Sequence, residues 1–243
     1  MKPTTPIHRL RRRAKLLSRE QGLPLHAAFD RIAAGEGFRN WGHLIASATG
    51  DAKPAAMAIA TQVLARLAPG DLVLVGARPG EGKTLLSVAL LGEAMKAGHR
   101  GAFFTLEFGE QDVARIMTRI GIKAADDELA FHLDCSDTIN AERIAQSLAT
   151  APRGTLAVVD YLQLLDHRRE NPPLMEQVRT LRNFARQSGV IIVFISQIDR
   201  SYDPSAKPFP DMDDVRLPNP LDLTLFDKMC FLNSGEVRFR QAA

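Results

Sequence analysis

Two hydrophobic patterns alternate along most of this chain from about residue 71 onward. Short runs of apolar, often β-branched residues are typical of buried strands, and apolar positions that recur every three or four residues are typical of helices. The expected strands are 71–76, 102–106, 130–135, 155–159, 190–196, 228–232 and 236–240, and the expected helices are 83–97, 110–120, 140–150 (capped near 136–138) and 174–188. This order predicts an α/β fold with a mostly parallel sheet flanked by helices. The last two strands predict an antiparallel edge hairpin turning at 233–235.

The first 50 residues have a purely helical pattern. In residues 7–21 the apolar side chains share one face, and basic side chains cover the others, which predicts an amphipathic helix. Two shorter helices, 25–34 and 38–47, follow glycine-containing breaks. We therefore divide the chain into a small basic helical module (1–50), a linker and helix (51–68) and an α/β domain (69–243). A core of about 50 residues is marginal, so the module is expected to pack on the domain or on another subunit.

Charge is distributed unevenly along the chain. The formal net charge is +3, yet residues 1–50 contain nine Lys and Arg against three Asp and Glu. A basic segment of this kind favours an anionic partner such as nucleic acid, for which Arg11, Arg12 and Arg13 are the candidates. A solvated basic helix with no such partner is the alternative, and composition does not separate the two.

The two cysteines, Cys135 and Cys230, lie far apart and lack metal-ligand spacing, as expected for thiols in a reducing compartment. The longest apolar run, Val190–Ile195, is too short to cross a membrane, and no apolar segment of a secretory signal follows the basic start. The sequence therefore indicates a cytoplasmic protein without a membrane partner, although the Arg-rich start leaves an organelle-targeting peptide open.

A glycine-rich turn joins the first expected strand to the next helix. It reads Ala77, Arg78, Pro79, Gly80, Glu81, Gly82, Lys83 and Thr84, a phosphate-binding loop with Ala in place of the usual first Gly. Glycines let backbone N–H groups point at phosphate oxygens, and the following helix N-terminus favours the same anion. Lys83 would contact the β- and γ-phosphates of ATP and the Thr84 hydroxyl would bind Mg²⁺. We predict a nucleotide site here rather than an ordinary strand–helix turn.

Polar side chains follow three of the later strands, where ligands of parallel sheets bind. Asp160 follows an apolar strand and is expected at Mg²⁺. Glu107 is placed to polarise the water that attacks the γ-phosphate, and Gln197 to sense that phosphate through its amide. The alternatives are a turn cap for Asp160, a helix cap for Glu107 and a satisfied polar residue at a strand end for Gln197.

Two loops near this edge combine basic and aromatic residues. One contains His167, Arg168 and Arg169, and the other contains Arg200, Tyr202, Lys207 and Phe209. Positive charge with interleaved aromatic rings suits single-stranded nucleic acid. Solvated loops would have the same composition.

Four segments together resemble the motor domain of DnaB-type replicative helicases. They are 67–71 running into the 77–84 loop, 104–108, 159–165 and 195–200, in the order of that family. The resemblance covers roughly residues 60–240. It implies a RecA-like fold, ATP and Mg²⁺ as cofactors, the roles given above for Lys83, Thr84, Glu107, Asp160 and Gln197, DNA contacts from the two basic loops, and a homo-oligomer, in that family a hexamer.

The resemblance has departures. The family carries a larger N-terminal domain than this short module, residues 213–216 look like a remnant of one family segment, and Arg238 or Arg240 would have to stand in for the family's trans-acting arginine. We therefore predict an ATP-hydrolysing, DnaB-like helicase-family protein acting on DNA, with single-stranded DNA as its expected form. The alternatives are a nucleotide-regulated DNA-binding or adaptor protein without unwinding activity, and a recombinase- or clock-type RecA relative, against which the 160–165 segment argues.

Overall fold

The computed structural model describes residues 3–5, 7–49, 53–78, 81–121, 131–166, 168, 170–217, 219–233 and 236–241. Its helices are α1 (Ile7–Gln21), α2 (Leu25–Gly35), α3 (Trp41–Thr49), α4 (Lys53–Leu64), α5 (Lys83–Lys96), α6 (Glu110–Ile120), α7 (Ala141–Ser147) and α8 (Leu174–Ser188), with 3-10 turns η1 (Leu162–Leu164), η2 (Met212–Asp214) and η3 (Leu223–Leu225). Its strands are β1 (Leu72–Ala77), β2 (Gly101–Thr105), β3 (Phe131–Asp134), β4 (Leu156–Asp160), β5 (Ile191–Gln197), β6 (Lys228–Asn233) and β7 (Glu236–Gln241). None of the described helices is long and apolar enough to cross a membrane.

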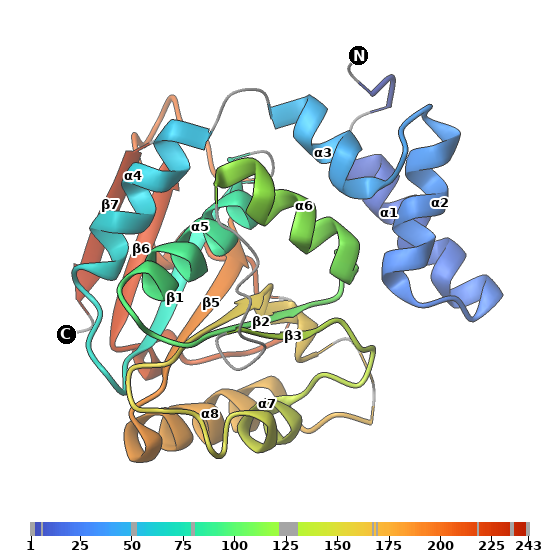
Figure 1. Ribbon diagram of the computed structural model, residues 1–243. Helices are drawn as coiled ribbons and strands as arrows, with labels where there is room; N and C mark the ends of the chain where they lie inside the picture. Colours follow the sequence, from blue (N-terminus) through green and yellow to red (C-terminus); the bar gives the residue numbers. More distant parts are fainter. Residues whose placement is uncertain are drawn as a thin grey trace.

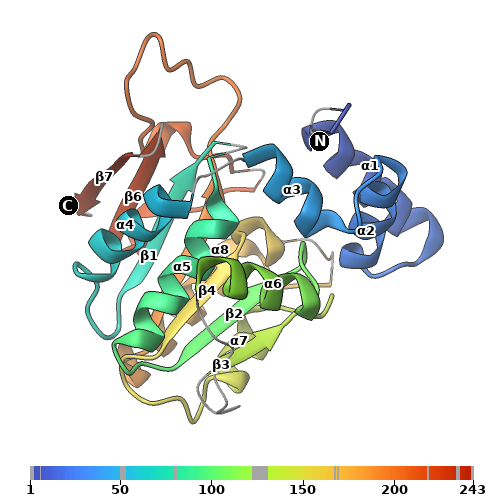
Figure 2. The ribbon, with the colours of Figure 1, turned by 45° about the horizontal axis from the view of Figure 1, so that its top comes forward.

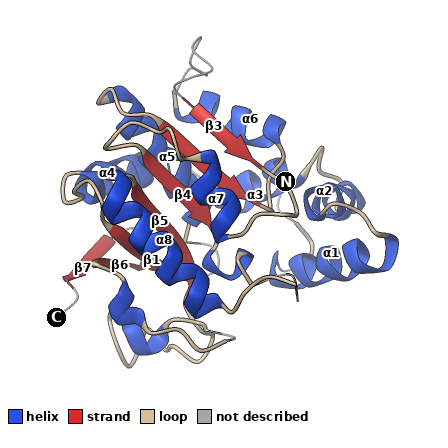
Figure 3. Ribbon diagram, turned by 90° about the horizontal axis from the view of Figure 1, so that it is seen from below, coloured by secondary structure: helices blue, strands red, loops and turns tan. Residues whose placement is uncertain are grey.

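The seven strands form one sheet in the order β3-β2-β4-β5-β1-β6-β7 (Figures 1 and 3). Strands β1 to β6 pair in parallel, and β7 pairs antiparallel with β6 at the edge. The predicted mostly parallel α/β fold and the predicted edge hairpin are confirmed. Because strands β1, β2, β4 and β5 lie side by side and parallel, their carboxyl ends meet along one edge of the sheet.

Each face of the sheet carries its own apolar core. Alternate residues of β1 show the division, since Val73 and Val75 join a cluster with α4, α5 and α6, whereas Leu72 and Leu74 join a cluster with α7 and α8. Figure 1 shows α5 and α6 on one side of the sheet and α7 and α8 on the other. The continuous apolar strand patterns follow from this burial on both faces.

Helix boundaries differ from the predicted ones in two informative places. Helix α7 is capped by Asn140, whose side chain accepts a hydrogen bond from the Arg143 N–H (2.9 Å), and not by the 136–138 segment. Helix α4 begins at Lys53, whereas the sequence predicted a linker over 49–54 and a helix only from residue 55. Both differences lie at element ends, where several polar residues compete for the same cap.

Helices α1, α2 and α3 form the N-terminal module, which lies beside the carboxyl end of β2 and against α6 (Figures 1 and 2). Its centre is the pair Phe29 and Trp41, both fully buried with ring centroids 4.6 Å apart. Leu10 and Ala14 of α1 close this core, which is continuous with the α5–α6 side of the domain. The small module thus gains burial by packing on the α/β domain.

Candidate nucleotide site

The 77–84 loop connects β1 to α5 at the carboxyl edge of the sheet. Gly82 caps α5 with φ 76°, a left-handed conformation that glycine adopts without strain. Lys83 Nζ turns back and donates a hydrogen bond to the Arg78 carbonyl (2.9 Å). Pro79 and Gly80 of the predicted loop lie outside the described residues.

The strand-end residues converge on this loop. Lys83 and Thr84 line a pocket of about 700 Å³ together with Glu107, Asp160 and Gln197. The side chains of the first four are buried, and Glu107 is only 2% exposed. The register explains the convergence, because β4 lies between β2 and β5 with Thr105 opposite Asp160 and Asp160 opposite Ile195.

Burial dominates the electrostatics of the pocket. It raises the pKa of Asp160 to about 6, with a further contribution from the neighbouring Glu107 carboxylate. Burial also lowers the pKa of Lys83 to about 8, and the positive charge of Arg11 acts in the same direction. Perturbed, oppositely charged groups gathered in one cleft are typical of functional sites.

The donor set fits Mg²⁺. Asp160 Oδ2 is buried and has no hydrogen-bond partner among the described residues, and the Thr84 side chain is close enough to act against the rise in the pKa of the same carboxyl. Within the described residues, no cluster of three His, Cys, Asp or Glu side chains could hold a metal alone. A site of one carboxylate and one hydroxyl matches Mg²⁺, which in nucleotide sites takes its other ligands from phosphates and water.

Gln197 lies between two hollows. It lines the 700 Å³ pocket and also an adjoining cleft of about 1080 Å³. Arg216 lines both hollows too and donates a hydrogen bond from Nη1 to Gln197 Oε1 (3.3 Å). Residue 216 belongs to the segment that the sequence marked only as a family remnant, so the structure adds it to the surroundings of Gln197.

Helix α1 forms a wall of the same pocket. Arg11 Nη2 lies 3.0 Å from Glu107 Oε2, and Lys15 Nζ donates a hydrogen bond to the Tyr161 hydroxyl (2.5 Å). Arg12, Lys15 and Arg19 also line the pocket. From the sequence, Arg11 was predicted to bind nucleic acid, and no residue of the N-terminal module was predicted at the candidate nucleotide site.

The other predicted nucleic-acid residues are spread over several places. Arg12 is exposed beside the nucleotide pocket, and Arg13 points to Glu36 (3.9 Å). Arg200 is exposed at the rim of the nucleotide pocket. Arg168 lines the adjoining cleft and pairs with Glu170 (2.9 Å), whereas His167 and Arg169 lie outside the described residues.

The long loop after β5 holds its aromatic side chains in place. Tyr202 is 5% exposed, and its hydroxyl donates a hydrogen bond to the Lys207 carbonyl (2.7 Å). Lys207 itself pairs with Asp211 and Asp214, both at 2.7 Å. The Phe209 ring lies under the guanidinium of Arg238 (4.4 Å). Stacking of bases on Tyr202 would therefore require this loop to open.

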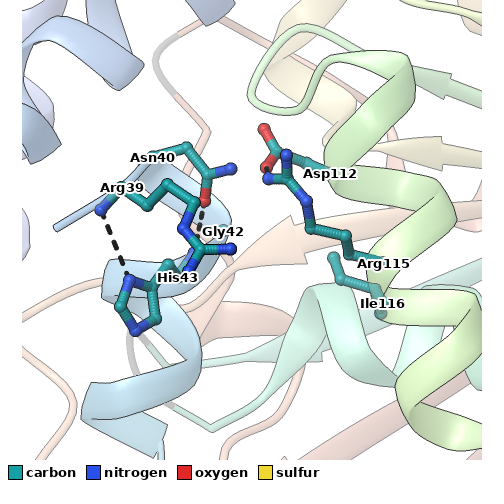
Figure 4. Close-up of a pocket in the computed structure, with 7 residues that line it drawn as sticks. All are labelled: Arg39, Asn40, Gly42, His43, Asp112, Arg115 and Ile116. Carbon is teal, nitrogen blue, oxygen red and sulfur yellow. Dashed lines mark hydrogen bonds and ion pairs between the residues drawn. The ribbon is translucent and has the colours of Figure 1, made fainter.

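A third hollow, of about 280 Å³, lies where the module meets the domain (Figure 4). Asn40 and His43 of the α3 region face Asp112 and Arg115 of α6 across it, and Asn40 Oδ1 accepts a hydrogen bond from the His43 N–H. Asp112 is 4% exposed and pairs with Arg115 at 3.2 Å. Burial, followed by the nearby Asp30 carboxylate, raises the pKa of Asp112. The contact between module and domain is therefore partly polar.

Comparisons with known proteins agree that this chain is similar to DnaB-like replicative helicases. The model of the DnaB-like helicase C terminal domain matches residues 122–222, which include Asp160 and Gln197. A probable plasmid replicative DNA helicase of Chlamydia trachomatis is 28% identical over 202 residues, covering 70% of this chain and 44% of the relative. The replicative DNA helicase DnaB of Helicobacter pylori is 23% identical over 192 residues, covering 65% of this chain and 39% of the relative. The chain thus spans less than half the length of these relatives.

Solved structures agree on the fold. One, described as an ATPase domain, matches with a TM-score of 0.53 and 20% identity, covering 69% of this chain and 70% of that chain. A DnaB-like replicative helicase, determined in a study of its interactions with primase, matches with a TM-score of 0.55 and 20% identity, covering 72% of this chain and 54% of that chain. These structures confirm the predicted RecA-like fold, and the family and sequence matches confirm the predicted resemblance to DnaB-like helicases.

Proposed function

We propose that this protein binds Mg-ATP in the 700 Å³ pocket, hydrolyses it, and uses the cycle to act on single-stranded DNA. The observation that carries the proposal is the convergence of Lys83, Thr84, Asp160 and Glu107 on one pocket at the carboxyl edge of the sheet. The resemblance to DnaB-like helicases supports DNA as the substrate. The free thiols of Cys135 and Cys230 fit a cytoplasmic location.

Nucleotide binding would use the loop and the start of α5. The positive end of α5 and the Lys83 ammonium attract the phosphates, and phosphate oxygens would replace the Arg78 carbonyl as the partner of Lys83 Nζ. Mg²⁺, when bound, would neutralise phosphate charge. Thr84 and Asp160 are the side chains that would hold it.

Hydrolysis would depend on Glu107. Its carboxylate would accept a hydrogen bond from the attacking water and take up its proton as the oxygen bonds to the γ-phosphorus and the bond to ADP breaks. Lys83 would offset the charge that develops on the departing phosphate group. Because Arg11 pairs with Glu107, this ion pair must loosen before the carboxylate can reach a water.

DNA would bind next to the nucleotide, in the cleft of about 1080 Å³ whose lining includes Arg168 and Arg216. Gln197 faces both hollows, so loss of the γ-phosphate could change the hydrogen bond between Gln197 and Arg216 and thereby the DNA cleft. Self-association into a ring, as the family resemblance implies, would bring several such clefts together.

The test is ATP hydrolysis by the Lys83→Ala variant, with and without single-stranded DNA. Loss of the ammonium should lower turnover by at least about 100-fold, because Lys83 stabilises charge on the transferred phosphate. Lys96→Ala, on the same helix but exposed, is the matched control and should keep wild-type turnover. Equal turnover in wild type and Lys83→Ala would show that the activity does not come from this pocket.

One observation favours a second candidate, a nucleotide-regulated DNA-binding protein with no productive turnover. The Arg11–Glu107 ion pair (3.0 Å) neutralises the carboxylate that hydrolysis needs. If that pair stays closed when nucleotide binds, ATP would order the site without being cleaved. In that case the wild-type protein would bind Mg-ATP and DNA but show no turnover above that of Glu107→Gln.

A further inference from the structure

We propose that Arg11, from the chain's own N-terminal helix, is the residue that contacts the γ-phosphate of ATP and stabilises its transfer. The inference rests on the proposed nucleotide site. It assigns to the module a catalytic side chain that acts in cis, within the chain that binds the nucleotide.

The Arg11 guanidinium lies at the candidate nucleotide pocket. Arg11 reaches this pocket from α1, and its Nη2 lies 3.0 Å from Glu107 Oε2. The pair is largely withdrawn from solvent, with side-chain exposures of 24% and 3%. The Arg11 charge is also close enough to add to the lowering of the Lys83 pKa that burial begins. Arg11 and Lys83 thus line the same pocket.

Arg11 also carries a hydrogen-bond donor that has no partner in the described part of the chain. Arg11 Nε is buried and has no hydrogen-bond partner among the described residues, and Asp160 Oδ2 in the same pocket lacks one as well. Leaving buried polar atoms unpaired is costly. Bound Mg-ATP would satisfy both atoms, since phosphate oxygens accept from the guanidinium and the cation binds the carboxylate. A guanidinium carries several N–H donors, so Arg11 can contact more than one phosphate oxygen.

Contacts on two sides of α1 hold this helix in position at the pocket. Arg11, Lys15 and Arg19 are spaced four residues apart, so they form one stripe of the helix, and all three line the pocket. Lys15 bonds to Tyr161, the residue directly after Asp160. Leu10 and Ala14 are fully buried in the module core. Buried apolar contacts behind the helix and polar contacts in front therefore fix the stripe at the nucleotide site.

These contacts suggest a sequence of events. The triphosphate brings several negative charges beside the single charge of Glu107, so the guanidinium turns toward the phosphate. Glu107 is then released to accept a hydrogen bond from water. ADP lacks the γ-phosphate, and with ADP bound Arg11 would stay on Glu107.

Affinity for Mg-ATP and Mg-ADP, measured in the Glu107→Gln background where hydrolysis is blocked, tests the proposal directly. Adding Arg11→Gln should weaken Mg-ATP binding about 10-fold or more, the worth of a charged hydrogen bond, and leave Mg-ADP binding unchanged. In the otherwise wild-type chain, Arg11→Gln should lower kcat by about 100-fold or more. Arg9→Gln, an exposed arginine of the same helix, is the matched control and should change neither.

Three results would overturn the proposal. A higher kcat in Arg11→Gln would make α1 an inhibitory cover. Equal weakening of both nucleotides would make Arg11 a structural contact of the module. If the parent Glu107→Gln protein binds no Mg-nucleotide, the proposed function itself is wrong. This result can be told apart from the first two results, in which nucleotide still binds. If Arg11→Gln does not fold, Arg11→Lys keeps the charge without the planar fork and should still weaken Mg-ATP selectively.

Discussion

At the scale of single residues, the strand ends explain why this pocket can be read from the sequence. Lys83, Glu107 and Asp160 each lie at or after the carboxyl end of an apolar strand, and parallel strands bring those ends together. The position of Arg11 could not be predicted in this way, because packing of the N-terminal module, and not strand pairing, brings α1 to the carboxyl edge of the sheet. A signal was present nevertheless, since Arg11 lies four residues after Ile7 and three before Ala14, at the border of the buried stripe.

Substitution of Glu107 tests the chemistry at this scale. Glu107→Gln should retain Mg-ATP binding and lower turnover by about 100-fold or more, because an amide hydrogen-bonds the water without taking its proton. Single-turnover hydrolysis and nucleotide affinity are the measurements. Glu110→Gln, an exposed glutamate in the first turn of α6, should behave as wild type. Unchanged turnover in Glu107→Gln would remove Glu107 from the reaction.

At the scale of elements, the order of strands and helices could be predicted from hydrophobic periodicity. The residues at which the elements end and the tertiary contacts that they make could not. The N-cap of α7 is Asn140 and not a residue of the predicted 136–138 segment, because several polar residues before the helix could act as its cap. The loop after β5 was expected to offer basic and aromatic side chains to single-stranded nucleic acid, or else to be a solvated loop. Its composition could not show that Tyr202 is buried or that Lys207 is paired with Asp211 and Asp214, because both facts depend on tertiary contacts.

The contact between α3 and α6 should depend on pH through Asp112. Its folded-state pKa is raised by burial, so the folded protein binds the proton more tightly than the unfolded chain does. The cost of the ionised form is present above that raised pKa and is lost as the pH falls toward the unfolded value. Asp112→Asn should therefore raise the Tm by a few degrees at pH 7.5, with a smaller gain at pH 5.

Unfolding can be followed by the fluorescence of Trp41, the one tryptophan of the chain, which is buried in the module. Because Asp112→Asn also breaks the ion pair with Arg115, Arg115→Gln serves as the control and should lack the pH-dependent gain. An equal gain at both pH values would show that ionisation of Asp112 does not weaken the contact.

At the scale of the whole molecule, the α/β part has a RecA-like fold, and helix α1 of the N-terminal module lines the candidate nucleotide pocket beside it. The resemblance predicted the fold of the α/β part correctly. It did not predict that α1 lines the pocket, because the segments that carry the resemblance lie outside residues 1–50. The predicted trans-acting candidates remain proposals. Arg238 stacks on Phe209, and Arg240 lines a separate hollow near Arg66.

Self-association is the prediction for the molecule as a whole. With a non-hydrolysable ATP analogue and single-stranded DNA, light scattering should give a mass several times that of the 26.7 kDa chain, and a hexamer would match the family. The same protein without either ligand is the comparison. A mass that stays at one chain under every condition would exclude a ring and leave DNA binding as a property of the monomer.

The wall that α1 builds has a consequence for how activity scales with dilution. A site completed by a neighbour loses its arginine when subunits separate, so its specific activity falls with protein concentration. A site completed by Arg11 carries all its groups on one polypeptide. Hydrolysis per molecule would then stay constant through dilution, and a mixture of Arg11→Gln and Lys83→Ala chains would show no mutual rescue, because neither chain could lend the other its missing group.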